Sequence, residues 1–359
     1  MAVHPLIEQA RANGTPLIDG ENVTFVWHGK TAPELIGDFN EWGHGMAGTA
    51  QLSQIADGVW TYQTTLPLDA YIEYIYTTDP DDPDKSVIDP FNRRQVSNGM
   101  DKINNFFPMP KRATNLMIEF MSNTPQGSVT RHAVFHPYLL GGDRRDVWLY
   151  QPPTDEPAPL LVVFDGKDYL RRAFITQIVA NLIAMKRIRP IAMALIDNAR
   201  AHRYLEYNAT DTVLAQITEL VMPLAYNNLA LIDHEQQPGS WGVLGASMSG
   251  LMALYTGLRL PHIFGKVITQ SGAFQLDLTD HQPIIADMVS HLPPRKLKIW
   301  QDVGTFEYLL DQNRRMRAML TGRGYDVTYR EGNSGHNWTA WHDLLPAALT
   351  AVFAPEISR

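Results

Sequence analysis

The first third of the chain contains short stretches in which apolar and polar residues alternate. A period of two is typical of strands with one buried and one exposed face. Turn-forming residues separate these stretches at intervals of about 8–12, which is the spacing expected of a β-sandwich. The alternating stretches are 23–27, 33–38, 58–66 and 71–77, and a proline-broken acidic loop, 79–85, follows the last of them.

From about residue 130 the pattern changes to apolar runs separated by helical stretches. Strands that alternate with helices predict a mainly parallel sheet covered on both faces. Residues 108–128, punctuated by Pro, Ser and Asn, are predicted to link the two patterns. We therefore expect an all-β domain over residues 1–112, with a short N-terminal extension, and an α/β domain over residues 113–359. The predicted strands of the second domain are 147–150, 160–164, 191–196, 241–244, 266–269 and 297–301, and its predicted helices include 170–187, 210–227 and 307–322.

The composition narrows the classes of function. Of the 359 residues, 45% are hydrophobic, which is enough for a sizeable core. The chain has 30 Lys and Arg against 38 Asp and Glu, so its net charge is −8, and neither nucleic acid nor an anionic membrane is an expected partner. Because there is no cysteine, disulfides, thiolate metal sites and cysteine nucleophiles are excluded. A nucleophile must then be another side chain, such as serine.

The sequence also lacks two targeting patterns. Its N-terminal residues do not show the basic segment and apolar segment of a secretory signal. No run approaches 18 uninterrupted apolar residues, so no membrane span is predicted. A cytoplasmic location is the resulting expectation.

A candidate nucleophile lies in the segment GASMSG, residues 245–250, between the apolar strand 241–244 and a helical stretch. A serine between small residues at a strand-to-helix turn is the arrangement of the nucleophile elbow, G-x-S-x-G. Ser249 stands where that pattern usually has glycine, a departure that its small side chain allows. The following helix would place its positive end near Ser247. We therefore predict that Ser247 is a nucleophile.

A nucleophilic serine needs a histidine base and an acid that orients the base. His336 lies in the polar loop 332–338, and the order serine, acid, histidine is that of α/β-hydrolases. The acid should follow strand 297–301, where Asp302 and Glu307 are both candidates. Asp302 stands at the strand end and Glu307 at the start of a helix, and spacing alone does not choose between them.

Ester hydrolysis also needs N–H groups that stabilise an oxyanion. One should belong to Met248, the residue after the nucleophile, and the other to a loop after an early strand. Asp165-Gly166-Lys167 follows strand 160–164 and forms such a loop, so the Lys167 N–H is the second candidate.

The predicted second domain contains, in this order, the segments LLVVFDGKDYL, IDNARAHRYLEYN, GVLGASMSGLMAL, FGKVITQSGAF, VGTFEYLLDQNRRMRAML and SGHNWTAWHDLL, and the predicted first domain contains GDFNEW, GVWTYQTTLPLDAYIEYIY and DPFNRR. The later segments resemble, in the same order, enterochelin-esterase-type hydrolases of the broader esterase D-like group. The N-terminal segments resemble the early-set, Ig-like domain that precedes such esterases and serves as a carbohydrate-binding module in glycogen-branching enzymes. The resemblance covers nearly the whole chain and implies an α/β-hydrolase catalytic domain preceded by an all-β Ig-like sandwich.

The resemblance also implies roles for single residues. Ser247 becomes the nucleophile and His336 the base, and Glu307 falls on the family's acid position, which favours it over Asp302. Substrate contacts are predicted for Asp165, Arg203, Phe306 and Trp338.

Arg203 and Glu206 match an R-x-x-E element that recurs near the active site in this family. Glu206 is expected to anchor a loop. Arg203 is expected either to face the substrate, where a guanidinium can hold catecholate or carboxylate oxygens, or to pair with Glu206.

Together these features predict a serine esterase that forms an acyl-enzyme and needs no metal or organic cofactor. The resemblance implies a triscatecholate siderophore ester as substrate, and any iron would then arrive with the substrate. Feruloyl and acetyl-sugar esters are also open, because a fold does not determine its substrate. The sequence does not indicate the oligomeric state.

A second hypothesis is a carbohydrate-binding protein with an inactive hydrolase domain. Trp27, Trp42, Trp60 and Tyr62 could stack on sugars, but strand aromatics usually pack inward, so we expect them in the sandwich core. The complete set of serine, histidine and carboxylate favours an active enzyme. A third hypothesis is acyl transfer to an alcohol in place of water.

Overall fold

The computed structural model of the protein describes residues 3–44, 48–99, 102–137, 139–142, 144–274 and 284–355. The chain divides into two compact units, each of which gathers segments from distant parts of the sequence. The first, which we call the sandwich unit, comprises Met1–Thr114, Gly304–Tyr308 and Glu331–Ala340. The second, the α/β unit, comprises Asn115–Val303, Leu309–Arg330 and Trp341–Arg359.

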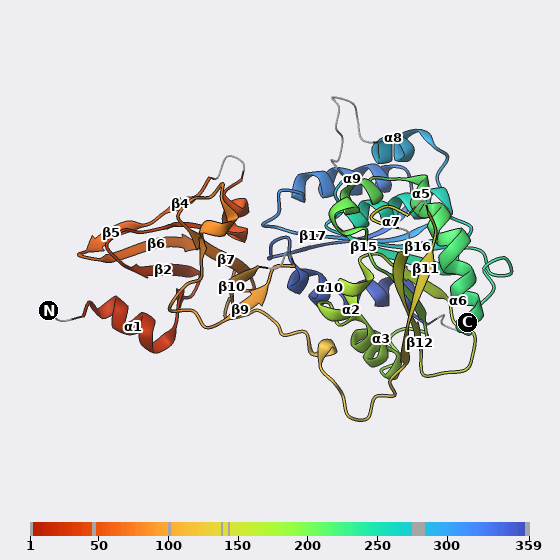
Figure 1. Cartoon of the computed structure of the whole chain (residues 1–359), viewed down its shortest axis with the longest axis horizontal. Helices are drawn as coiled ribbons and strands as arrows, with labels where there is room; N and C mark the ends of the chain where they lie inside the picture. The colour runs from red at the N-terminus through yellow and green to blue at the C-terminus, as the bar shows by residue number, and fades with distance from the viewer. Residues whose placement is uncertain are drawn as a thin grey trace. The chain divides into compact units, whose positions relative to one another are not determined.

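Two antiparallel sheets form the body of the sandwich unit (Figure 1). One has the strand order β1-β2-β6-β5 and the other β4-β3-β7-β10-β9, with β8 paired to β7. Val23 and Phe25 of the first sheet share one buried core with Leu35, Tyr74 and Phe107 of the second, so the sheets pack face to face. The elements are α1 (Pro5–Asn13), β1 (Leu17–Asp19), β2 (Asn22–His28), β3 (Glu34–Gly37), the 3-10 turn η1 (Asp38–Gly43), β4 (Ala50–Gln51), β5 (Ser53–Ala56), β6 (Val59–Thr65), β7 (Tyr71–Thr77), β8 (Ser86–Val87), β9 (Gln95–Ser97) and β10 (Ile103–Pro108).

The predicted alternation is found in β6 but not in β7. Residues of β6 alternate between more buried and more exposed positions, whereas all seven residues of β7 are buried. The reason is that β7 is an interior strand whose two faces are both covered. Tyr74 lies in the sandwich core on one face, and on the other Glu73 accepts a hydrogen bond from Asn104.

Among the described residues, the α/β unit contains an eight-stranded sheet with the order β11-β12-β14-β13-β15-β16-β17-β18. β12 pairs antiparallel with β11 and β14, whereas β14, β13, β15, β16 and β17 are parallel neighbours. The predicted fold class, antiparallel sheets followed by a mainly parallel α/β sheet, is thereby confirmed. The strands are β11 (Ser128–Phe135), β12 (Arg144–Gln151), β13 (Leu160–Val163), β14 (Ala192–Ile196), β15 (Trp241–Ala246), β16 (Phe264–Gln270), β17 (Lys298–Gly304) and β18 (Asp326–Gly332).

Helices cover both faces of this sheet, with α5, α7, α8 and α9 on one face and α2, α3 and α10 on the other (Figure 1). Val162 and Val243 from the strands share a buried core with Leu254 of α7 and Leu320 of α9. The helices are α2 (Gly166–Arg171), α3 (Ile175–Ala184), α4 (Arg203–Glu206), α5 (Asp211–Ala215), α6 (Met222–Asn228), α7 (Met248–Arg259), α8 (Ile284–His291), α9 (Leu310–Gly322) and α10 (Trp338–Phe353).

No helix within the described ranges combines the length and the apolar character that crossing a bilayer would require.

Candidate active site

Ser247 occupies a strained turn between β15 and α7. Its φ of 60° and ψ of −122° are rare for any residue other than glycine and cost about 1–3 kcal/mol. Main-chain hydrogen bonds hold the turn, since Ser247 N–H donates to Gln270 O (2.8 Å) and Ser247 O accepts from Ala273 N–H (3.0 Å). The neighbours must be small, because a β-carbon on Gly245 would lie 2.1 Å from Ser249 O. The structure thus has the strand–turn–helix geometry of an elbow at Ser247.

Ser249 ties this elbow to the loop that follows β13. Its buried Oγ donates to Asp165 Oδ2 (2.6 Å) and accepts from Ala246 N–H (2.9 Å). Phe164 N–H donates to Leu244 O (2.9 Å), so the ends of β13 and β15 lie side by side. Ser249, at the position where glycine is usual, therefore makes a connection that glycine could not make.

The two N–H groups predicted for an oxyanion hole lie at the starts of helices. Met248 is the first residue of α7, and Lys167 is the second residue of α2. The first N–H groups of a helix have no acceptor within it, and the helix dipole makes this end positive. Gly166 lets α2 begin close against the sheet, because a β-carbon there would lie 2.4 Å from the carbonyl carbon of Leu195. Both N–H groups follow adjacent parallel strands, β13 and β15.

Asp165 is buried and forms an ion pair with Arg203. Arg203 Nε and Nη2 donate to Asp165 Oδ1 and Oδ2 at 2.7 and 2.6 Å. Burial acts to raise the pKa of Asp165, but the charge and hydrogen bonds of Arg203, with hydrogen bonds from Ser249 and Asn198, bring it below its usual value. Asp165 is therefore an ionised anchor for the loop that carries Lys167.

The alternative in which Arg203 pairs with Glu206 is wrong. Glu206 pairs instead with Arg145 (Nη2 to Oε1, 3.0 Å), and its Oε2 accepts from Ala199 N–H (2.9 Å). Burial raises the pKa of Glu206 in spite of the opposing charge of Arg145. Glu206 thus anchors a loop, as expected, but with a partner from β12. The pairing was missed because Arg145 is 61 residues away in the sequence, whereas Arg203 is in the same turn of α4.

Glu307 and His336 form a hydrogen-bonded pair in the sandwich unit. His336 Nδ1 lies 2.6 Å from Glu307 Oε2, and the Glu307 side chain is fully buried while that of His336 is 22% exposed. Glu307 Oε1 accepts from Gly304 N–H (2.8 Å), which orients the carboxylate. With Nδ1 facing a carboxylate, the favoured neutral tautomer carries its proton on Nδ1 and has Nε2 as the basic nitrogen.

Asp302, the other candidate acid, is buried in β17 of the α/β unit. Its Oδ2 accepts from Trp300 Nε1 (2.5 Å) and from Gln270 Nε2 (3.1 Å). The hydrogen bond with Gln270 joins β16 to β17, so Asp302 has a structural role in the sheet.

The remaining predicted residues occupy varied positions. Phe306 packs against the sandwich core, and Trp338 is the half-buried first residue of α10. Substrate contact by these two side chains stays a prediction. Of the strand aromatics, Trp27, Trp60 and Tyr62 pack against the sandwich core.

A buried carboxylate that was not predicted from the sequence lies beside the Glu307–His336 pair. Asp38, the first residue of η1, is 1% exposed. Burial, helped by the charge of Glu307, raises its pKa to about 7, although hydrogen bonds from Glu73 N–H and Trp42 and the charge of His336 act to lower it. The signal that could have revealed it is an acidic residue in the turn GDFNEW, directly before the aromatic residue Phe39.

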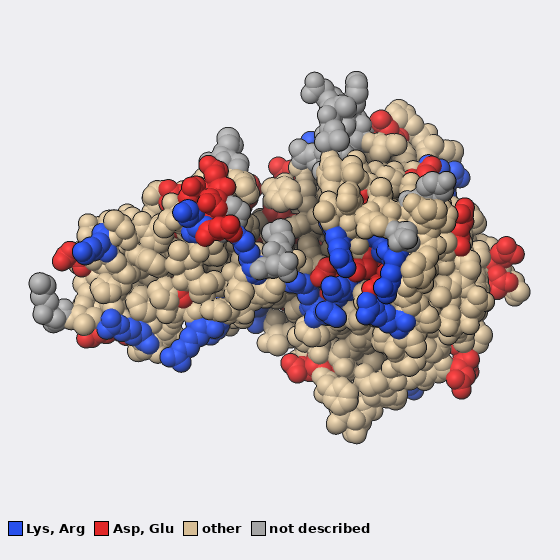
Figure 2. Space-filling model, in the orientation of Figure 1, with Lys and Arg blue, Asp and Glu red and all other residues tan. Residues whose placement is uncertain are grey.

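Figure 2 shows Lys and Arg side chains gathered on the α/β unit, with acidic side chains among them, over the region in which Figure 1 shows α2. We call Lys167, Arg171 and Arg200 the basic cluster. Burial raises the pKa of Asp197, and the charges of Lys167 and Arg200 act against this rise, so both cations lie near Asp197. Arg171 is exposed on α2. The basic cluster is a local exception on a chain whose net charge is −8.

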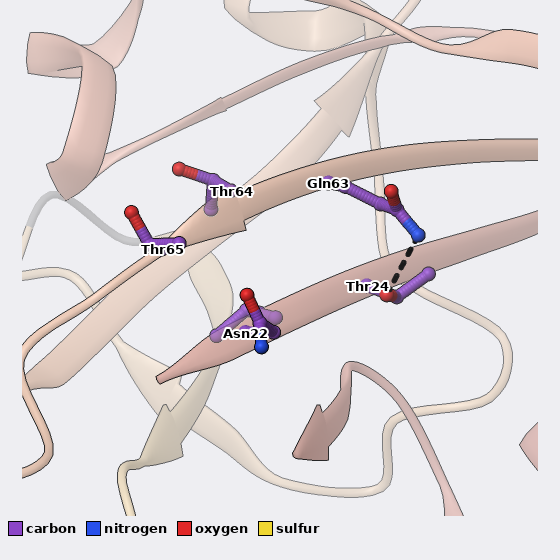
Figure 3. Close-up of a pocket in the computed structure, with 6 residues that line it drawn as sticks. Asn22, Thr24, Gln63, Thr64 and Thr65 are labelled. Carbon is purple, nitrogen blue, oxygen red and sulfur yellow. Dashed lines mark hydrogen bonds between the residues drawn. The ribbon is translucent and has the colours of Figure 1, made fainter. Parts of the chain in front are cut away.

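A hollow of about 390 Å³ lies on the sandwich unit where β2 and β6 run side by side (Figure 3). Hydroxyl and amide side chains line it, and Gln63 Nε2 donates to Thr24 Oγ1 (3.5 Å). The polar lining residues are Asn22, Thr24, Gln63, Thr64 and Thr65. The predicted catalytic residues are not among them.

Comparison with known sequences identifies the family. The profile of the Esterase family, described as "Putative esterase", matches residues 140–352. The chain is 27% identical over 221 residues to an iron(III) enterobactin esterase of Dickeya dadantii, a match that covers 56% of this chain and 50% of that protein. It is 24% identical over 226 residues to an iron(III) salmochelin esterase of Escherichia coli, with coverage of 58% and 54%. The chain thus spans about half the length of the curated relatives it matches.

Comparison with solved structures shows a similar fold over nearly the whole chain. The ferric enterobactin esterase of Salmonella typhimurium has a TM-score of 0.75 at 20% identity and covers 92% of this chain and 93% of its own. The enterobactin esterase of Shigella flexneri has a TM-score of 0.73 at 20% identity, with 92% coverage of each chain. The resemblance to enterochelin-esterase-type hydrolases is confirmed, and the chain belongs to the Esterase family, with the fold of the enterobactin esterases.

Proposed function

We propose that the protein is a serine carboxylic-ester hydrolase with Ser247 as its nucleophile. The observation that carries the proposal is the strained backbone of Ser247, φ 60° and ψ −122°, between a buried strand and a helix. Such strain is uncommon and clusters at functional sites, because the surrounding structure must stabilise it. The bonds that fix the turn, to Gln270 and Ala273, come from main-chain atoms and leave the Ser247 hydroxyl for chemistry.

In this mechanism His336 is the base and Glu307 the acid that orients it. Ser247 Oγ attacks the ester carbonyl as its proton passes to His336 Nε2, and Glu307 stabilises the resulting imidazolium through Nδ1–H. Collapse of the tetrahedral intermediate breaks the ester C–O bond, and the alcohol leaves with the proton from His336. Water then attacks the acyl-enzyme by the same route and releases the carboxylic acid. The 2.6 Å contact between Nδ1 and Oε2 supports these roles.

The Met248 and Lys167 N–H groups are the proposed oxyanion donors. Their positions at the starts of α7 and α2 support this assignment, because helix N-termini present N–H groups and positive potential to an anion. Ser249 and Asp165 hold the two loops together through a 2.6 Å hydrogen bond.

For the substrate we propose an ester of a catecholate siderophore, with iron, if any, as part of the substrate. The names of the matched relatives, iron(III) enterobactin and salmochelin esterases, support this class. The basic cluster of Lys167, Arg171 and Arg200 supports it too, because catecholate oxygens are anionic and cations favour their binding. Arg203 is a weaker candidate for substrate contact, because Asp165 already pairs with its guanidinium.

The nucleophile is tested with a fluorophosphonate probe and p-nitrophenyl butyrate. We expect the wild type to hydrolyse the ester and to be labelled at Ser247, and Ser247→Ala to lose both properties with an unchanged circular dichroism spectrum. Ser240→Ala is the matched control, since Ser240 is also buried and precedes the same strand, β15. A wild type that is neither active nor labelled would exclude a serine esterase.

A substrate panel then distinguishes the ester classes. Catecholate siderophore, feruloyl, acetyl-sugar and short p-nitrophenyl esters are compared by kcat/KM, each with Ser247→Ala as the blank. A preference for the siderophore ester supports the proposal, and a preference for feruloyl or acetyl-sugar esters replaces it. Glycan binding by an inert wild type would favour the carbohydrate-binding hypothesis, for which the polar hollow at Thr24 and Gln63 is the first place to mutate.

A further inference from the structure

Asp38 connects the strands of the sandwich unit to the loop that carries His336. Its Oδ2 accepts from the backbone N–H of Glu73 (2.8 Å) and from Asn337 Nδ2 (3.2 Å), and its Oδ1 accepts from Trp42 Nε1 (3.0 Å). One buried carboxylate thus joins β7, η1 and the residue that follows His336.

The residue that precedes His336 packs against the same carboxylate. A β-carbon on Gly335 would lie 2.0 Å from Asp38 Oδ1, so only glycine fits there without a shift of the loop or of the carboxylate. Gly335 and Asn337 are both buried. Asp38 therefore contacts both sequence neighbours of His336, and close packing leaves the backbone between them little freedom to move.

Main-chain pairing fastens the same loop a few residues earlier. Tyr71 N–H donates to Asn333 O (2.9 Å), and Tyr71 forms a parallel bridge with Ser334. Ser334 O in turn accepts from the N–H of Phe306 (3.2 Å), the residue before Glu307. The segments of the acid and of the base are thus paired with each other and with β7.

The charge of Asp38 also acts on the pair. Burial raises the pKa of Asp38, the hydrogen bonds from Glu73 N–H and Trp42 oppose that rise, and the charges of Glu307 and His336 act in opposite directions. The charges of Asp38, Glu307 and His336 therefore interact with one another. A neutral side chain at position 38 would remove the contribution of Asp38 to these interactions.

We propose that Asp38 is a positioning residue for the esterase reaction and acts through His336. Its carboxylate holds Gly335 and Asn337 so that the imidazole remains directed at Glu307. The catalytic part of this inference rests on the proposed function, whereas the placement of His336 can be measured without any substrate. A turn in the N-terminal strands thereby takes part in the chemistry of a histidine close to the other end of the chain.

Two variants test the contact from its two sides. Asp38→Asn keeps the size of the side chain but removes its charge and one acceptor oxygen. Asn337→Ser keeps the N-cap of α10, because Asn337 Oδ1 accepts from Ala340 N–H (2.9 Å) and serine caps helices equally well, but serine is too short to reach Asp38. If Asp38→Asn does not fold, Asn337→Ser still tests the contact.

Asp89→Asn is the matched control for damage to the strands. Asp89 is also 1% exposed, also has a pKa raised by burial, and accepts from Thr15 Oγ1 (2.7 Å), Tyr74 OH (2.7 Å) and Phe91 N–H (2.9 Å). These partners all precede residue 114, so the substitution perturbs the strands without touching the His336 loop.

The first readout is the low-field proton NMR signal of His336 Nδ1–H, assigned by its loss in His336→Gln. We expect this signal in the wild type and in Asp89→Asn, and its loss or broadening in Asp38→Asn and Asn337→Ser. An unchanged signal in both test variants would overturn the placement of His336 by Asp38, whether or not the protein hydrolyses esters.

The second readout is the pH profile of ester hydrolysis. We expect Asp38→Asn and Asn337→Ser to lower kcat by roughly 10–100-fold with little change in KM, because a small misplacement of a catalytic group has this effect. In Asp38→Asn the part of the pH profile near pH 7 that comes from titration of Asp38 should also be lost. Equal losses of kcat in Asp89→Asn would show that the effect is structural. An inert wild type would contradict the proposed function and leave the NMR result to decide the role of Asp38.

Discussion

Ser249 Oγ donates a 2.6 Å hydrogen bond to Asp165 Oδ2, although 84 residues separate the two in the sequence. This bond joins the turn of Ser247 to the loop of Lys167. It therefore helps to fix the distance between the two proposed oxyanion donors, the N–H groups of Met248 and Lys167. Both groups are buried, and loss of the donor would leave Asp165 with one hydrogen bond fewer.

We therefore expect Ser249→Ala to lower the free energy of unfolding by about 1–3 kcal/mol, because the buried Ala246 N–H loses its acceptor and Asp165 loses one of its donors. The kcat for p-nitrophenyl butyrate should fall as well, while fluorophosphonate still labels Ser247. Urea denaturation and steady-state kinetics measure the two effects. Stability and kcat equal to those of the Ser240→Ala control would mean that the hydrogen bond between Ser249 and Asp165 contributes neither to stability nor to catalysis.

The two candidate acids are separated by Glu307→Gln and Asp302→Asn. In Glu307→Gln the amide oxygen can still accept from Gly304 N–H, which turns the amide NH₂ toward His336 Nδ1 and favours the wrong tautomer of the imidazole. We expect kcat to fall by roughly 100-fold or more.

Asp302→Asn can keep its amide oxygen toward Trp300 and Gln270, so its effect should be a loss of stability with a smaller loss of kcat. The measurement is kcat for both variants with folding checked by circular dichroism. A large loss of kcat in Asp302→Asn alone would transfer the role of acid to Asp302.

The raised pKa of Asp38 predicts a pH dependence of stability. Because burial raises this pKa from 3.8 to about 7 on folding, the folded protein binds the proton more tightly than the unfolded chain does. The stabilisation is fully present below about pH 4 and is lost as the pH rises through 7, by at most about 4 kcal/mol. Asp38→Asn is neutral throughout and lacks this loss, so the stability of the variant relative to the wild type should rise between pH 4 and 7.

Urea denaturation at several pH values measures this difference. Asp57→Asn is the control variant, because it removes an exposed carboxylate in place of a buried one. A difference between Asp38→Asn and the wild type that does not change with pH would mean that Asp38 is ionised at the same pH in the folded and unfolded states.

Features that depend on neighbouring residues were predictable from the sequence. The elbow at Ser247 was predicted because its geometry follows from small residues between a strand and a helix. The parallel sheet was predicted because buried strands and helices alternate over a long stretch. The burial of both faces of β7 was not predicted. The alternating pattern of β7 predicts one exposed face, but Glu73 on that face is buried and accepts a hydrogen bond from Asn104.

Contacts between distant segments were not predictable in the same way. The partner of Arg203 is Asp165, 38 residues earlier, whereas sequence spacing pointed to Glu206 in the same helical turn. The contact between Asp38 and Asn337 joins residues 299 positions apart, and no local pattern encodes it. Such pairs arise from the tertiary fold, which brings the turn after β3 to the segment that follows β18.

Asn333 Nδ2 donates a hydrogen bond to Asp69 Oδ1, although 264 residues separate the two in the sequence. This separation determines when the contact can form during synthesis on the ribosome. Synthesis proceeds from the N-terminus at about 5–20 residues per second, so roughly 13–53 s pass between the two residues. During that interval the segment that contains Asn333 has not yet been synthesised. The pairing of Tyr71 with Asn333 and Ser334 can therefore form only after more than nine tenths of these 359 residues have been synthesised.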